Sequence, residues 1–148
     1  MSATIHILLA DDDPDDREFF AEAIQSIDLP HKLTMFEDGQ ALMDYLSGVE
    51  LEIPHILFLD LNMPCKSGFD CLDDIRKNDK LRDLSVAIYS TSSSERDVEE
   101  AFVGGANIYI KKPSDFQHLK KMVSDVVKMN WQYHNSGLNR DNFLYSIQ

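Results

Sequence analysis

Positive charge and long apolar stretches are both scarce in this chain. It carries 14 Lys and Arg residues against 26 Asp and Glu residues, which gives a formal net charge of -12 at pH 7. Surfaces that bind nucleic acid or an anionic membrane need patches of Lys and Arg. No apolar stretch approaches the roughly 18 residues of a membrane-spanning helix. The composition therefore predicts no nucleic-acid partner and no membrane partner.

Cysteine is scarce as well, since Cys65 and Cys71 are the only two. They lie six residues apart, form no CxxC motif and resemble no disulfide framework, which favours a reducing compartment. The N-terminus shows no basic segment followed by an apolar one, so we identify no signal peptide. These features together predict a cytoplasmic protein.

The 148 residues suffice for one domain, in which apolar stretches alternate with helix-like stretches. Such alternation indicates βαβ units and hence an α/β fold with a parallel sheet. Two residue pairs, Asp13-Pro14 and Gly104-Gly105, mark a helix start and a helix stop. We predict strands at 5–10, 32–36, 55–59, 85–90 and 107–110, and helices at 14–27, 39–47, 68–78, 94–103 and about 115–130.

Four of the predicted strands end in a polar group. They are followed by Asp11-Asp12-Asp13, by Asp60, by Ser90-Thr91 and by Lys111-Lys112. In an open α/β sheet the carboxyl ends of the strands share one edge, where ligands bind. Carboxylates, a hydroxyl and an ammonium at one edge suit a divalent cation and a phosphoryl group.

Three adjacent carboxylates at the end of a buried strand repel one another, and a bound cation removes that penalty. Mg²⁺ prefers oxygen ligands and is typically held by one or two carboxylates together with a phosphate. We therefore predict Mg²⁺ as the cofactor, with Asp11, Asp12 and Asp60 as candidate ligands. Asp13 has the alternative role of capping the helix that starts at Pro14, and Asp15 and Asp16 are predicted to be solvated.

Two other readings of the acidic segment stay open. Asp11, Asp13, Asp15 and Glu22 fit positions 1, 3, 5 and 12 of a calcium-binding loop, but Asp16 stands where that loop needs Gly. The Asp-x-Asp pattern also resembles phosphatases of the haloacid-dehalogenase type, with Asp11 as nucleophile and Asp13 as acid. The residue two places further on is Asp15, where that family usually has Thr or Val.

An Asp carboxylate is a competent nucleophile toward a phosphoryl group. The transfer needs neutralised charge and in-line positioning more than it needs an acid or a base. Lys112 offers positive charge and Ser90 a hydrogen-bond donor. The backbone carbonyl of Asn62 is a candidate metal ligand, although Asn62 is equally interpreted as a plain turn residue.

From about Thr4 to Asn130 the chain resembles the receiver domain of bacterial two-component response regulators, of the chemotaxis-regulator type. The matching segments, and the gaps of thirty and twenty-two residues that separate Asp60, Ser90 and Lys112, all fit this family. The segments are ILLADDDPDD (7–16), FLDLNMP (58–64) with Gly68, AIYSTSS (87–93) and GANIYIKKP (105–113).

The resemblance implies a flavodoxin-like (βα)5 three-layer sandwich with a five-stranded parallel sheet of order 2-1-3-4-5. It implies that Asp60 accepts the phosphoryl group and that Asp11, Asp12, Asp60 and the Asn62 carbonyl hold Mg²⁺. Lys112, which directly precedes Pro113, would pair with the phosphate, and the Lys112–Pro113 bond would be cis. Ser90 and Tyr109 would form the switch, with Thr91 as a competitor of Ser90.

We therefore predict a single-domain response regulator that is a phosphoprotein and not an enzyme in its own right. A sensor histidine kinase or a histidine phosphotransfer protein would donate the phosphoryl group, and a downstream protein target would read the switch. The alternatives are a phosphorylation-independent adaptor with the same fold and the small phosphatase. Residues 131–148 form a short aromatic extension, which either packs on its own domain or contacts another chain, and a homodimer is possible.

Overall fold

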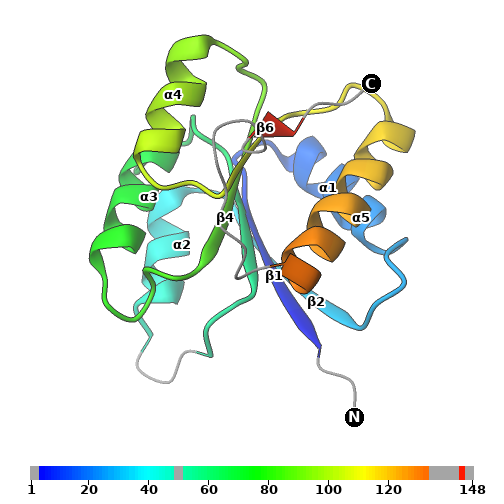
Figure 1. Ribbon diagram of the computed structural model, residues 1–148, viewed down its shortest axis with the longest axis horizontal. Helices are drawn as coiled ribbons and strands as arrows, with labels where there is room; N and C mark the ends of the chain where they lie inside the picture. The colour runs from blue at the N-terminus through cyan, green and yellow to red at the C-terminus, as the bar shows by residue number, and fades with distance from the viewer. Residues whose placement is uncertain (1–3, 49–51, 134–143, 146–148) are drawn as a thin grey trace.

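The computed structural model describes residues 4–48, 52–133 and 144–145, with 130–133, 144 and 145 described by their backbone alone. One parallel sheet lies between two layers of helices (Figure 1). The strands are β1 (Ile5–Ala10), β2 (His31–Phe36), β3 (Ile56–Leu59), β4 (Ser85–Ser90), β5 (Ile108–Lys111) and β6 (Leu144–Tyr145). The helices are α1 (Pro14–Ile24), α2 (Gly39–Leu46), α3 (Gly68–Lys77), α4 (Glu95–Val103) and α5 (Phe116–Tyr133).

The sheet has the order β2-β1-β3-β4-β5-β6, which confirms the predicted order of the first five strands. Every neighbouring pair is parallel, as βαβ connections require. The sixth strand was not predicted. It comes from the aromatic extension and pairs Leu144 with Tyr109 and Tyr145 with Ile110 on the same chain.

Strand residues alternate between the two faces of the sheet and so feed two separate cores. Leu8 and Leu57 pack with helices α2, α3 and α4, whereas Ile7 and Phe58 pack with α1 and α5. Figure 1 shows these two helix layers on opposite sides of the sheet. Burial on both faces explains why β1, β3 and β4 are nearly all apolar.

Side-chain caps fix where the helices start. The Asp13 carboxylate accepts from the backbone N–H groups of Asp15 and Asp16, while Ser67 and Ser94 cap α3 and α4 in the same way. These caps fix where α1, α3 and α4 begin after the carboxyl ends of β1, β3 and β4, and the loop before α3 is the longest of the three.

Four details differ from the sequence-based predictions. Helix α1 ends at Ile24 rather than residue 27, and α5 continues past residue 130 to Tyr133. Phe19, whose helical spacing indicates a core position, is 47% exposed and packs its ring on Phe116 of α5. The Lys112–Pro113 peptide bond is trans. Within the described residues, none of the helices combines the length and the apolar character needed to cross a bilayer.

Candidate phosphoryl and metal site

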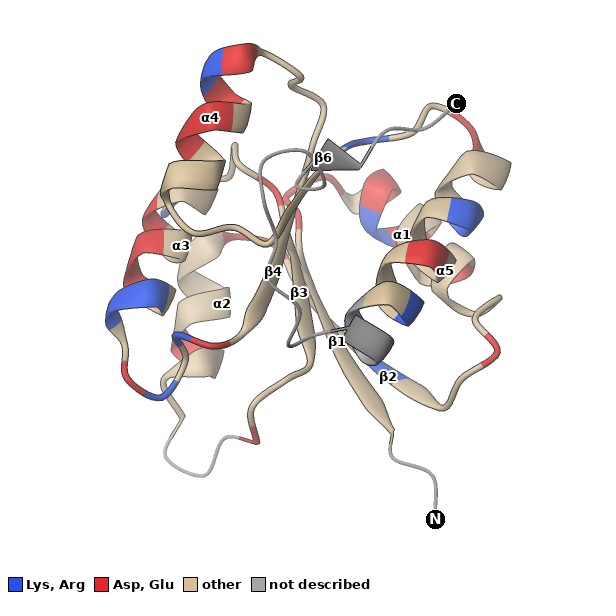
Figure 2. Cartoon of the chain, in the orientation of Figure 1, with Lys and Arg blue, Asp and Glu red and all other residues tan. Residues whose placement is uncertain are grey.

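The candidate site lies at the carboxyl ends of β1, β3, β4 and β5. Backbone hydrogen bonds continue just past the strand ends and hold the following residues in register. Asp60 donates to the Ala10 carbonyl at 3.0 Å, and Lys112 donates to the Ser90 carbonyl at 2.8 Å. Acidic residues colour the upper end of β1 and β3 in Figure 2. The sheet edge that the sequence indicates is therefore the edge where these side chains meet.

Three carboxylates converge there. One oxygen from each of Asp11, Asp12 and Asp60 can be chosen so that all three lie within 4.8 Å of one another. Asp11 is fully buried, Asp60 is 6% exposed, and Asp12 is exposed. The trio therefore combines a buried floor with an open side, through which a cation can enter and keep several of its waters.

Lys112 supplies the positive charge of the site. Its Nζ lies 2.8 Å from Asp11 Oδ2, 2.9 Å from Asp16 Oδ2 and 3.3 Å from Asp60 Oδ2, and only 9% of its side chain is exposed. Lys111 is exposed. The choice of Lys112 over Lys111 thus agrees with the geometry.

The structure also brings in a residue that sequence reasoning missed. Asp16 was expected to be solvated, but it forms an ion pair with Lys112 and its side chain is 35% exposed. The missed signal was helical spacing. Asp16 stands four positions before the buried Phe20 and so lies on the inward side of α1, whereas Asp15 is exposed.

Asp11 has a spare acceptor. Its Oδ1 accepts from the Asp13 backbone N–H at 3.0 Å. Its buried Oδ2 is paired with the Lys112 ammonium at 2.8 Å and has no other hydrogen-bond donor among the described residues. A buried oxygen of this kind is costly unless something else binds it. Carboxylate oxygens with spare capacity are the donor set that Mg²⁺ and Mn²⁺ prefer, so the residues fit a divalent cation.

Burial and the close packing of charged groups shift the pKa values of Asp60 and Lys112. Burial, together with the charge of Asp11, raises the pKa of Asp60 from its ordinary value of 3.8 to about 6, although Lys112 opposes the shift. Burial on its own would lower the pKa of Lys112, but the carboxylates of Asp11, Asp16 and Asp60 outweigh it and raise that pKa. Asp60 is therefore largely ionised at neutral pH and Lys112 is fully charged.

The hydroxyl at the site is that of Ser90, which is fully buried at the end of β4, whereas Thr91 is exposed. Ser90 Oγ accepts from the Ser92 backbone N–H at 3.1 Å. The Tyr109 ring is fully buried, and its hydroxyl donates to the Ser92 carbonyl at 2.8 Å. Ser90 and Tyr109 are thus joined through one residue of the β4–α4 loop.

The loop after Asp60 is tight. Gly68 donates to the Leu61 carbonyl at 2.9 Å, and a Cβ at Gly68 would lie 2.2 Å from the Asp60 carbonyl oxygen. Only Gly permits this close approach. Asn62 is exposed, and its backbone N–H makes a long contact of 3.4 Å with Asp60 Oδ1. The turn holds the Asp60 carboxylate toward Asp11 and Lys112.

The structure does not join the residues of the two alternative motifs. Asp13 is occupied as the cap of α1, and Glu22 is exposed further along the same helix. Within the described part of the chain, the group that could hold a metal contains Asp11, Asp12 and Asp60 but not Asp13, Asp15 or Glu22. The calcium loop and the phosphatase pairing of Asp11 with Asp13 therefore gain no support.

Comparisons with known proteins decide the family. The model of the response regulator receiver domain matches residues 7–124. The chain belongs to the response regulator receiver domain family. This confirms the resemblance drawn from the sequence, and it places the chain among the proteins of two-component signalling.

Individual relatives agree with this assignment. The receiver domain is 32% identical over 124 residues to the response regulator Rcp1 of Synechocystis sp., covering 81% of this chain and 84% of Rcp1. The phosphorylated cyanobacterial phytochrome response regulator RcpA has a TM-score of 0.81 at 28% identity, covering 87% of this chain and 95% of RcpA. The Mn²⁺-bound form of Rcp1 has a TM-score of 0.76 at 29% identity, covering 91% of this chain and 99% of Rcp1.

Proposed function

We propose that this receiver domain accepts a phosphoryl group from a phosphohistidine onto Asp60, with Mg²⁺ bound at Asp11, Asp12, Asp60 and the Asn62 carbonyl. The observation that carries the proposal is the placement of Lys112. Its ammonium contacts Asp60 and Asp11 at the point where three carboxylate oxygens converge. The phosphorylated RcpA structure and the Mn²⁺-bound Rcp1 structure show that relatives of this fold take a phosphoryl group and a divalent cation.

In the proposed reaction an Asp60 oxygen attacks phosphorus, a P–O bond forms, and the P–N bond to the donor imidazole breaks with its electron pair retained by nitrogen. Mg²⁺, when bound, neutralises charge on the transferred group. Lys112 gives up its long contact with Asp60 and donates to a phosphoryl oxygen. Preorganised positive charge of this kind is the main contribution that a protein makes to phosphoryl transfer.

The same phosphoryl group would operate the switch. We assign Ser90 as the hydroxyl that donates to a phosphoryl oxygen, and Tyr109 as its aromatic partner. Movement of Ser90 Oγ releases the Ser92 N–H, and Ser92 also accepts from Tyr109. A local change in charge would thus reach the β4–α4 loop, Tyr109 and β5. The resemblance implies that the Tyr109 ring turns inward when Asp60 is loaded, and this ring is fully buried in the structure.

We infer a stand-alone regulator, because the shared region fills 84% of Rcp1 and 95% of RcpA. Its donor is a sensor histidine kinase or a histidine phosphotransfer protein, and a downstream protein target reads the switch. The two free cysteines, Cys65 and Cys71, agree with a cytoplasmic location. An adaptor that works without phosphorylation is disfavoured by the complete set of site residues.

The test is loading with acetyl phosphate and Mg²⁺, followed by intact mass and by mapping of the acid-labile phosphate. We expect one phosphoryl group per chain on the peptide that contains Asp60, and no loading of Asp60→Asn. Asp70→Asn, which removes an exposed carboxylate from the first turn of α3, is the matched control and should load normally.

Three outcomes contradict the proposal. Loading that survives in Asp60→Asn would refute the assignment of Asp60, and dependence on Asp11 with release of inorganic phosphate from small esters would favour the phosphatase. Normal recognition of the downstream target by Asp60→Asn would favour the adaptor.

A further inference from the structure

We propose that Asp16 is a positioning residue, which binds the Lys112 ammonium from helix α1 and competes with the phosphoryl group for it. Asp16 would thereby weaken the hold of the site on phosphate and shorten the lifetime of the loaded state. This inference rests on the proposed role of Asp60 as phosphoacceptor, and it adds a residue from outside the four strand ends.

The contacts of Lys112 carry the inference. An ammonium has three donor hydrogens, and three carboxylates surround this one. The hydrogen bond to Asp16 Oδ2 is 2.9 Å long, while the bond to Asp60 Oδ2 is 3.3 Å long. The bond to Asp16 is therefore shorter than the bond to the acceptor Asp60, and only the 2.8 Å contact with Asp11 is shorter still.

The direction of the effect follows from what remains when Asp16 loses its charge. Lys112 stays in place, because Asp11 and Asp60 still contact it and its Nζ lies 5.3 Å from the centre of the Tyr89 ring. The cation then has one fewer anion to satisfy, so more of its positive charge is available to a phosphoryl oxygen. Loss of charge at Asp16 should tighten binding of a phosphoryl group rather than loosen it.

The adjacent residue, Asp15, provides a matched control. Asp15 also lies in the first turn of α1 and carries the same charge, but its side chain is exposed. Asp15→Asn and Asp16→Asn change the net charge of the protein equally. A difference between them reports the specific contact with Lys112 and not the general field of the acidic surface.

The experiment measures the affinity of beryllofluoride, a phosphoryl mimic, in the presence of Mg²⁺, together with the hydrolysis rate of the acetyl-phosphate-loaded protein. We expect Asp16→Asn to bind beryllofluoride about two- to fivefold more tightly and to lose phosphate correspondingly more slowly, the range expected for one partly exposed ion pair. Asp15→Asn should match the wild type. Unchanged or weaker binding by Asp16→Asn overturns the inference.

A double variant tests whether Asp16 acts through Lys112. When Asp16 is neutral, Lys112 interacts more strongly with Asp11 and Asp60, which are the carboxylates that would bind Mg²⁺. The Asp16→Asn substitution should therefore lower the affinity for Mg²⁺ about two- to fivefold. In a Lys112→Met background the same substitution should have no more effect than Asp15→Asn. Thermal melts with Mg²⁺ establish that each variant is folded, and Lys112→Gln serves as the background if Lys112→Met is not. An undiminished Asp16 effect in that background overturns the inference.

Asp60→Asn separates this inference from the proposed function. If Asp60→Asn loses beryllofluoride binding while Asp16→Asn binds beryllofluoride as the wild type does, only the role of Asp16 is overturned. Binding that persists in Asp60→Asn overturns the proposed function.

Discussion

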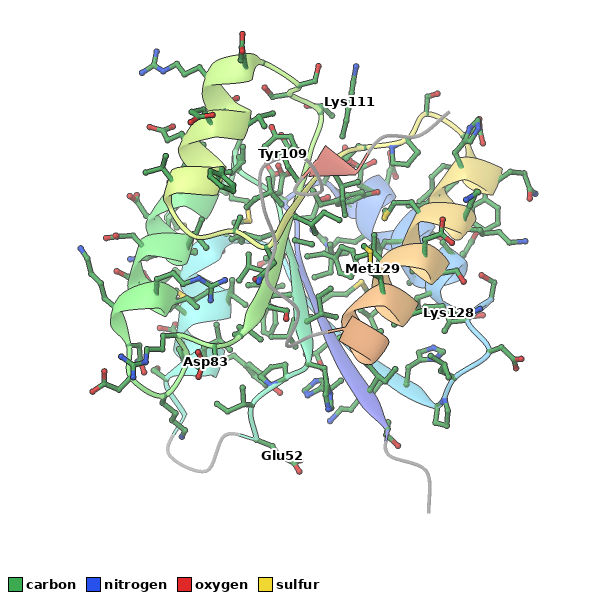
Figure 3. All side chains as sticks on the ribbon, viewed as in Figure 1. Glu52, Asp83, Tyr109, Lys111, Lys128 and Met129 are labelled. Atoms are coloured by element: carbon green, nitrogen blue, oxygen red, sulfur yellow. The ribbon has the colours of Figure 1, made fainter. Side chains whose placement is uncertain are left out.

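Two partly buried cationic side chains lie at opposite ends of the sheet, and they have very different surroundings. Lys112, at the carboxyl ends of the strands, is surrounded by the carboxylates of Asp11, Asp16 and Asp60. Arg76, on α3, lies beside the amino ends of β4 and β5, where neutral oxygens surround it. Figure 3 shows these ends by their labelled residues, with Tyr109 and Lys111 at one and Glu52 at the other.

Every nitrogen of the Arg76 guanidinium is used. Nε and the two terminal nitrogens make four hydrogen bonds of 2.7 to 2.9 Å, to the backbone carbonyls of Gly105, Arg82 and Leu84 and to Asn107 Oδ1. Asn107 Oδ1 also accepts from the Val86 backbone N–H at 2.7 Å. Arg76 thus ties α3 to the loops before β4 and β5.

The contrast separates a structural cation from a functional one. Around Arg76 every guanidinium nitrogen donates to a neutral oxygen of the protein, so the cation joins segments of the fold to one another. Around Lys112 three carboxylates share one cation, so negative charge remains in excess. Unsatisfied charge of this kind costs stability and is retained where it has a use.

Removal of Lys112 should have the largest effect on stability. Lys112→Met leaves buried carboxylates without their cation, and loss of one partner from such a group costs about 3–5 kcal/mol. We expect the free energy of unfolding to fall by this order without metal, and to recover partly with Mg²⁺. Lys111→Met, an exposed neighbour, should change it by less than about 0.5 kcal/mol. Urea unfolding with and without Mg²⁺ measures both, and equal effects of the two substitutions would contradict the account.

Arg76→Met should lower the free energy of unfolding by about 2–3 kcal/mol, because its acceptors lose hydrogen bonds to a charged donor. Loading with acetyl phosphate should stay normal at temperatures where the variant is folded. Lys77→Met, at the exposed next position of α3, is the control. If a folded Arg76→Met protein failed to accept a phosphoryl group, the proposed separation between a structural role for Arg76 and a role in the site for Lys112 would be wrong.

The Asp60→Asn substitution should raise the free energy of unfolding, whereas the two preceding substitutions lower it. Burial raises the pKa of Asp60 to about 6, so the ionised carboxylate destabilises the metal-free protein at pH 7. A shift of this size corresponds to about 2 kcal/mol after allowance for residual solvent. We expect the free energy of unfolding of Asp60→Asn to exceed that of the wild type by this order, and the gap to narrow when Mg²⁺ stabilises the wild type. A less stable variant in chelator would be the contrary result.

The same pKa shift has a signature in pH. Between about 4 and 6 the folded protein binds more protons at Asp60 than the unfolded chain does, since the raised pKa belongs to the folded state. The contribution of Asp60 to stability is therefore favourable at low pH and is lost as pH rises through about 6. The difference in the free energy of unfolding between Asp60→Asn and the wild type should disappear as the pH falls toward 4. A difference that stays constant with pH would show that the titration of Asp60 is not its source.

Tyr109→Phe should have the smallest effect. It removes the hydroxyl that donates to the Ser92 carbonyl and keeps the buried ring. One such hydrogen bond contributes about 1 kcal/mol. We expect that loss in urea unfolding and unchanged loading by acetyl phosphate, because the hydroxyl lies outside the group around Lys112. A loading defect would extend the site to Tyr109.

The parallel α/β sheet and the convergence at one sheet edge could be predicted because both follow from local patterns, whereas the strand order 2-1-3-4-5 was implied by the resemblance to the receiver family. Apolar strands fix the parallel sheet, and a residue directly after a strand must lie at its edge. Asp16 escaped prediction because its contact with Lys112 joins positions 96 residues apart. Arg76 escaped for the same reason, since its acceptors come from loops whose proximity only the folded chain reveals.

Strand β6 could not have been predicted either. It has two residues, and its position depends on where α5 ends and on the free edge of β5. Leu144 pairs with Tyr109 because the edge of β5 is available there, and the sequence of the segment does not by itself specify this pairing. Short strands of this kind carry no detectable periodicity.

The most direct test of the account is an experimental structure of the protein with Mg²⁺ and beryllofluoride. We predict that beryllium bonds to an Asp60 carboxylate oxygen, with Mg²⁺ on Asp11, Asp12 and Asp60 and with Lys112 Nζ donating to a fluorine. Beryllofluoride on Asp11, or on Asp60 with Lys112 turned away, would contradict it.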